Sequence, residues 1–164
     1  MQISQLAAAW FLPFAVAIGL WVAWSDMKFM KIPNKAVLAL GAVFLCLGPI
    51  LLPFDQFLWQ LAQLAIILAI GFVLNMVGLV GAGDAKFAAV MAPFVALGDL
   101  KLFLAVFASV LLAAFVSHRS LGMVPAFRRL TADWESWERK DFPMGLALAG
   151  VLIFYLVLAL RFGS

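Results

Sequence analysis

The chain has 164 residues, of which 67% are hydrophobic and only 12% are charged, with a formal net charge of +3. A typical soluble domain is about 45–50% apolar and about 25% charged. A soluble core of this size cannot bury so much apolar surface, so the composition predicts a single membrane-embedded domain over residues 1–164. The positive charges form short clusters and no basic helix face with interleaved aromatics, which argues against nucleic-acid binding.

Six apolar runs, separated by charged or glycine- and proline-containing loops, predict an all-α bundle of about six transmembrane helices in a lipid bilayer. The runs are Leu6–Trp24, Ala36–Leu52, Phe57–Val80, Phe87–Leu97, Leu102–Val116 and Met144–Leu160. The fourth run is short, because 11 residues rise only about 16 Å as an α-helix. We expect it to be tilted, broken or partly re-entrant, which is tolerated where the backbone lines a protein cavity.

The placement of Lys and Arg predicts the orientation of the bundle, because cytoplasmic loops of membrane proteins carry an excess of both. One side of the predicted bundle carries nine such residues and the other carries two, Lys101 and Arg161. We expect the first side to be cytoplasmic and both termini to be periplasmic. The nine are Lys28, Lys31, Lys35, Lys86, Arg119, Arg128, Arg129, Arg139 and Lys140.

The only sizeable polar stretch covers residues 117–143. Its large apolar residues recur at spacings of three and four, which is the pattern of one helix face. We therefore predict an amphipathic helix in the cytoplasmic interface, with an ordinary soluble connector as the alternative. The residues of that face are Met123, Phe127, Leu130, Trp134 and Trp137.

Asp84 lies in the sequence Gly81-Ala82-Gly83-Asp84-Ala85-Lys86, between long apolar runs. Glycine adopts backbone conformations closed to other residues and permits the close approach of another chain. A carboxylate at membrane depth is costly, so a Gly-x-Gly-Asp loop in this position indicates a functional acid. The alternative is a pair of glycines that merely ends a helix.

Asp26 follows the first apolar run and is separated by five residues from Ile32-Pro33-Asn34. Pro33 excludes a continuous helix from the first span into the second. Asn34 is expected to cap the second span. Taken alone, this segment is typical of a connector that contains an interfacial charge.

Together, Asp-x5-Ile-Pro-Asn after the first span and Gly-x-Gly-Asp-x-Lys after the third resemble the motifs of the prepilin peptidases, which are intramembrane aspartic proteases that process type IV and Flp pilin precursors. The segment Phe142-Pro143-Met144-Gly145 is similar to the family's Pro-Tyr-Gly sequence, with Met144 in place of tyrosine. Larger members carry N-terminal cysteine pairs and also methylate the new pilin terminus. With Cys46 as its single cysteine, this chain resembles the short, peptidase-only members.

The resemblance implies a catalytic pair, Asp26 and Asp84, whose carboxyl groups share a proton and activate a water molecule. It also implies a prepilin substrate, no metal or cofactor, and a place in the bacterial inner membrane with the site facing the cytoplasm. The sequence does not determine the oligomeric state. The residues expected to shape the loop or to bind substrate are Gly81, Gly83, Lys86, Pro33 and Asn34.

Two functions of other classes remain open. A non-enzymatic pilus or secretion assembly subunit would use the aspartates as plain interfacial charges. A small proton-coupled transporter predicts acids spread along the depth of the bundle, whereas Asp26 and Asp84 are expected at one mouth. A metalloprotease is disfavoured, because His118 is the only histidine and cannot form a His-x3-His pair.

Overall fold

The computed structural model describes residues 1–164 as helices and connecting turns, without strands. Five helices are long and apolar enough to cross a membrane. The long helices are α1 (Gln5–Phe29), α2 (Asn34–Leu51), α3 (Phe54–Met76), α5 (Leu100–Gly122) and α7 (Met144–Phe162). The short elements are α4 (Ala82–Met91), α6 (Pro125–Leu130) and the 3₁₀ turns η1 (Ala92–Phe94), η2 (Leu97–Asp99) and η3 (Glu135–Trp137).

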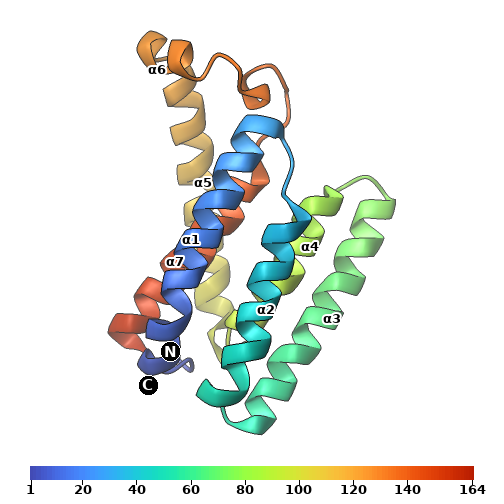
Figure 1. Cartoon of the computed structure of the whole chain (residues 1–164), viewed down its shortest axis with the longest axis vertical. Coiled ribbons are helices and arrows are strands. Elements are labelled where there is room, and N and C mark those ends of the chain that lie inside the picture. The colour runs from blue at the N-terminus through green and yellow to red at the C-terminus, as the bar shows by residue number, and fades with distance from the viewer.

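The centre of the bundle is the antiparallel pair α1 and α7 (Figure 1). Small residues allow these two helices to approach closely, as is common between helices in membranes. A Cβ atom placed on Gly19 of α1 would lie 3.1 Å from Ile153 and 3.4 Å from Ala149 of α7. In Figure 1, α2, α3 and α4 lie on one side of the pair, and α5, which packs against α7, passes behind it.

The faces that point away from the pair are apolar. Leu45, Ile50, Ile66 and Phe72 are all exposed, although each is large and hydrophobic. No residue in the most apolar window of α5 is buried inside the protein. An apolar surface of this extent requires a lipid environment, so the chain is a membrane protein.

The fourth predicted span, Phe87–Leu97, is not one long helix. It covers the second half of the ten-residue helix α4, then η1 and the first residue of η2. Pro93 has no backbone N–H, so it cannot continue the α-helical ladder. Gln63 of α3 can donate its side-chain amide to the carbonyl oxygens of Ala92 and Val95, at 3.2 Å each, which ties this irregular segment to α3. The predicted count of about six transmembrane helices is therefore not confirmed.

The amphipathic helix expected in the polar segment 117–143 is also not confirmed. Helix α5 continues to Gly122, and only the six-residue α6 and the turn η3 follow before α7 begins. The break comes at Thr131, whose hydroxyl donates back to the Phe127 carbonyl at 2.8 Å. The Trp137 indole N–H donates to the Thr131 carbonyl at 3.0 Å, so the aromatic residues fold onto one another rather than along one helix face.

The two ends of the bundle differ in charge. Both termini lie at one end, where the N-terminal amino group donates to the Phe162 carbonyl at 2.9 Å (Figure 1). The end of α1, the starts of α2, α4 and α7, and the whole of α6 lie at the other end. That end carries the nine Lys and Arg residues assigned to one side from the sequence. We call it the basic end.

Candidate active site

Asp26 belongs to the last turn of α1, two residues beyond the predicted end of the first span. No helix-breaking residue intervenes before Pro33, so α1 continues to Phe29 and ends at Met30 in the left-handed conformation, φ 50°. The Asp26 side chain is only 5% exposed. Its Oδ2 accepts a hydrogen bond of 2.7 Å from the backbone N–H of Gly145, the second residue of α7. The carboxylate is thus held at a helix N-terminus, where free N–H groups favour negative charge.

Gly145 is the residue of the site that sequence analysis did not assign. A Cβ atom placed on it would lie 2.9 Å from Asp26 Oδ2 and 3.0 Å from Asp26 Cβ. Only glycine therefore lets α7 approach the carboxylate this closely. The signal in the sequence was a glycine in the first turn of the last span, noted in the segment Phe142–Gly145, but nothing local connected it to Asp26.

Asp84 is the third residue of α4, after the N-cap residue Gly81. Its carboxyl group folds back over that glycine, because a Cβ atom on Gly81 would lie 2.6 Å from Asp84 Oδ2. An acid in this position commonly reaches the N-cap backbone N–H. Burial first, and then the nearby Asp26 carboxylate, raise the pKa of Asp84 to about 6, against the opposing effect of the Gly81 N–H.

The structure brings Asp26 and Asp84 to one pocket of about 260 Å³ at the basic end. Six of the seven residues predicted for the site line it, and Pro33 does not. The lining residues are Asp26, Met30, Lys31, Ile32, Asn34, Gly81, Ala82, Gly83, Asp84 and Lys86. Two carboxyl groups far apart in the sequence therefore share one small cavity.

Gly83 places α4 against the turn that follows α1. A Cβ atom on Gly83 would lie 3.3 Å from the Cβ of Ile32, which is tighter than ordinary contact. The same turn is held by the Ser25 hydroxyl, which donates to the Lys31 carbonyl at 2.9 Å. Gly83 therefore shapes the pocket by close packing against Ile32.

Asn34 does not cap α2 with its side chain, contrary to the sequence prediction. The N-cap residue is Pro33, which makes no side-chain cap, and its carbonyl accepts from Ala36 and Val37. Asn34 Oδ1 instead accepts a long hydrogen bond of 3.4 Å from Lys86 Nζ. Lys86 and Asn34 are exposed and join the starts of α2 and α4 at the rim of the pocket.

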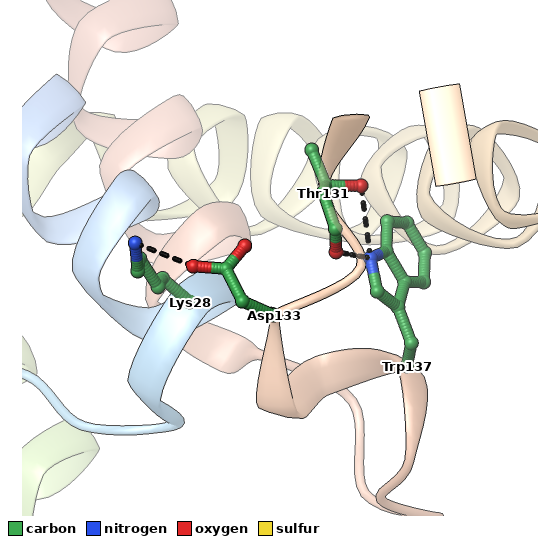
Figure 2. Close-up of polar contacts among 4 residues, drawn as sticks. All are labelled: Lys28, Thr131, Asp133 and Trp137. Atoms are coloured by element: carbon green, nitrogen blue, oxygen red, sulfur yellow. Dashed lines mark hydrogen bonds and ion pairs between the residues drawn. The ribbon is translucent and has the colours of Figure 1, made fainter. Parts of the chain in front are cut away.

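The segment between α6 and η3 is tied to α1 close to the candidate site (Figure 2). Lys28 Nζ forms a 2.7 Å ion pair with Asp133, and this interaction lowers the pKa of the Asp133 carboxyl. On the same segment, the Trp137 indole N–H bonds the carbonyl and the hydroxyl of Thr131. Lys28 lies two residues after Asp26, so the pair ties the polar segment to the helix that carries this acid.

The fold and this pocket define a helical membrane protein with paired acids at one mouth of its bundle. A family model described as the type IV leader peptidase family matches residues 13–118, which is more than half of the chain. The chain belongs to the type IV leader peptidase family and is therefore a protease of the membrane. The matched residues include Asp26 and Asp84 but end before Gly145.

No curated protein matches the chain significantly. No solved structure matches it significantly either.

Proposed function

We propose that this protein is an aspartic endopeptidase that removes the basic leader of prepilins, with Asp26 and Asp84 as its catalytic residues. The observation that carries the proposal is that these two carboxyl groups line the same 260 Å³ pocket in a member of the leader peptidase family. Peptide hydrolysis requires an activated water and a polarised carbonyl, and a pair of carboxyl groups that share one proton supplies both.

The chemistry follows from the state of the pair. The ionised carboxylate takes a proton from water as the water oxygen adds to the scissile carbonyl carbon. The protonated carboxyl group donates a hydrogen bond to the carbonyl oxygen, on which negative charge develops in the tetrahedral intermediate. The tetrahedral intermediate then collapses, and its C–N bond breaks as a proton passes to the leaving amine. The protons belong to the pair, so we assign no separate acid and base. The raised pKa of Asp84 supports a proton held between the two groups.

The hydrogen bonds of Asp26 suit such a role. Its Oδ2 accepts from the Gly145 N–H, and this is the one hydrogen bond made to its carboxyl group. An ionised carboxyl group has about four acceptor positions, so Asp26 keeps capacity to bind a water molecule on the pocket side. The N-terminus of α7 orients the carboxylate while its free oxygen faces the reaction.

We place the pocket at the cytoplasmic face of the bacterial inner membrane and the termini in the periplasm. The support is the distribution of charge, because nine of the eleven Lys and Arg residues lie at the basic end. On this orientation the pocket meets the leader of a precursor where it leaves the membrane. Lys86 at the rim would balance charge or bind lipid phosphate, and Gly81 and Gly83 would shape the loop that receives the substrate.

The test is cleavage of co-expressed candidate prepilins by the full chain in membranes, followed as loss of the leader on a gel. Asp26→Asn and Asp84→Asn should each reduce the rate by about 10²–10⁴-fold, because each removes half of the acid–base pair. Asp55→Asn is the matched control, since Asp55 is an exposed acid at the first turn of α3, far from the pocket. Unchanged processing by both pocket variants would refute the aspartic mechanism and favour a non-enzymatic assembly subunit.

A further inference from the structure

The turn between α1 and α2 forms one wall of the acid pocket, and its backbone has little support of its own. Met30 is in the left-handed conformation, φ 50°, which is unfavourable for a residue other than glycine. Lys31 and Ile32 take part in no backbone–backbone hydrogen bond. All three residues line the pocket. A strained turn of this kind keeps one shape only where contacts from outside the turn fix it.

Ser25 supplies one of these contacts. It precedes Asp26 on α1 and is only 5% exposed. A serine in a helix commonly donates to the carbonyl one turn earlier. The Ser25 hydroxyl instead reaches past the end of α1 and donates to the Lys31 carbonyl at 2.9 Å. No backbone N–H donates to the same carbonyl, so Ser25 ties the turn to α1.

The other side of the turn packs against α4. Ile32 is 9% exposed, and a Cβ atom on Gly83 would lie 3.3 Å from the Ile32 Cβ and 3.6 Å from the Ile32 backbone nitrogen. The path from one acid to the other therefore runs from α1 through the Ser25 hydrogen bond and the turn to Gly83, which precedes Asp84. Because the contact at Gly83 is tight, a shift of the turn displaces α4 relative to α1.

We propose that Ser25 is a positioning residue of the proposed protease, whose hydrogen bond to the turn sets the separation of the Asp26 and Asp84 carboxyl groups. Ser25 does not line the pocket, so it acts through the turn and not on a substrate. The inference rests on the proposed function, because it concerns the same acid pair. Two carboxyl groups share one proton only when they are close, and a displacement of about 1 Å at a reacting group costs on the order of 10²-fold in rate.

The charged groups around the acid pair do not include Ser25, so its substitution leaves them all in place. Helix α7 contributes the Gly145 N–H and no ionisable side chain at this end. A change in how the acids titrate after substitution of Ser25 therefore reports their separation. The other charged groups at this end of α1, the turn, α2 and α4 are Lys28, which pairs with Asp133 of the polar segment, Lys31 and Lys86, which line the pocket, and Lys35.

The experiment measures kcat and KM of the purified full chain in detergent, with the precursor that wild type cleaves as the substrate. Ser25→Ala removes the donor, and we expect kcat to fall at least about tenfold while KM stays within about twofold of wild type. The basic limb of the profile of kcat against pH should move to lower pH by roughly 0.5–1 unit, because separated acids lose their shared proton sooner. Ser25→Thr keeps the donor and should restore both values.

Ser109→Ala is the matched control. The Ser109 hydroxyl also donates to a backbone carbonyl at 2.9 Å, that of Ala105, but it lies on α5 and outside the pocket lining. This variant loses a hydrogen bond of the same kind and length. It should keep the wild-type kcat and the wild-type pH profile.

A measurement without substrate separates this inference from the protease proposal. Burial and the Asp26 carboxylate raise the pKa of Asp84 to about 6, and carboxyl ¹³C NMR of the full chain follows its titration. Ser25→Ala should lower the midpoint of this titration, whereas Ser25→Thr and Ser109→Ala should not. Continued processing of precursors by Asp26→Asn and Asp84→Asn would refute the protease proposal and leave this measurement in force.

Three outcomes would overturn the proposal. Equal kcat, basic limb and Asp84 midpoint in Ser25→Ala and wild type would show that the hydrogen bond does not set the separation of the acids. A lower Tm of Ser25→Ala, with the basic limb and the midpoint unchanged, would make Ser25 important only for stability. Values for Ser25→Thr equal to those of Ser25→Ala would show that the hydroxyl is not the group responsible.

Discussion

Two buried carboxyl groups lie at opposite ends of the bundle and differ in the number of hydrogen bonds that they accept. Asp99, at the end with the termini, is 6% exposed, and Asp26 is 5% exposed. Both oxygens of Asp99 accept from the Gln2 N–H at 2.9 Å, and its Oδ2 also accepts from the Tyr155 hydroxyl at 2.8 Å. Asp26 accepts from Gly145 alone.

This difference shows that burial of an acid does not by itself indicate chemistry. Asp99 bonds to the N-terminal segment and to α7 while itself belonging to η2, so its carboxylate joins three parts of the fold. Asp26 has unused acceptor positions and faces a cavity that also contains Asp84. We propose that Asp26, which has free acceptor positions beside a pocket, acts on the substrate, whereas Asp99 holds parts of the fold together through its two donors.

Among variants that keep both acids, the largest effect is expected from disturbing the single contact that orients Asp26. Gly145→Ala introduces a methyl group 2.9 Å from its Oδ2, so the carboxylate or α7 must shift. A displacement of about 1 Å at a catalytic group costs on the order of 10²-fold in rate. We expect that loss in a cleavage assay with little change in membrane insertion.

Gly41→Ala is the control for this substitution. Gly41 is also helical, but a Cβ atom there would lie 3.6 Å from Val90, which is an ordinary contact. This variant should cleave at the wild-type rate. Equal activity of Gly145→Ala and Gly41→Ala would show that the approach of α7 to Asp26 has no catalytic importance.

Both acids of the pocket could be predicted from the sequence because their signals are local. Pro33 prevents one continuous helix from α1 into α2, and Gly81 precedes the short helix that carries Asp84. These residue types fix where helices begin and end, so both acids could be assigned to the same mouth of the bundle. The structure then places both acids in one pocket, which supports the predicted pairing.

The contacts of Gly145 and Asp99 could not be predicted, because both depend on how distant segments pack. Gly145 meets Asp26 only because α7 lies antiparallel to α1. From its neighbour Gly98, the sequence predicts only that Asp99 ends a helix, whereas its side chain bonds to Tyr155 and Gln2. Hydrophobic periodicity carries no information on such pairs.

In the polar segment 117–143, the local periodicity predicts a helix, but tertiary contacts determine a different structure. The spacing from Met123 to Trp137 fits one helix face, yet the chain breaks at Thr131. Trp137 stacks on His118 of α5, and its indole N–H donates to the Thr131 carbonyl. These contacts hold Trp137 beside α5 and not on a helix that continues from Phe127. Here the aromatic residues at helical spacing pack on one another around a turn and do not extend one helix.

An effect of intermediate size is expected from removing a hydrogen-bond donor to Asp99. Tyr155→Phe removes a donor to Asp99 and also leaves the Ala96 N–H, which donates to the Tyr155 oxygen at 3.2 Å, without its acceptor. Unpaired buried polar groups cost about 1–3 kcal/mol, so thermal unfolding in detergent should show a lower Tm. Cleavage per folded molecule should not change, because the network lies at the other end of the bundle. A fall in kcat at an unchanged Tm would contradict the structural assignment of Asp99.

The smallest expected effect is a change in the pH dependence of stability at Asp84. Its pKa is about 6 when folded, above the ordinary value of about 3.9, so the native state binds more protons than the unfolded state between these limits. The contribution of this carboxyl group to stability is therefore fully present below about pH 4 and is lost as the pH rises through 6. Asp84→Asn removes the titration. Solvent screening of this partly exposed carboxyl group reduces the effect to about 1 kcal/mol, so the Tm of the variant relative to wild type should rise by about 2–4 °C between pH 4 and pH 8. A hydrogen bond to Gly81 that asparagine fails to make would change the Tm difference between the two proteins by the same amount at every pH. Parallel curves of Tm against pH for the two proteins would therefore mean that Asp84 is not desolvated in the pocket.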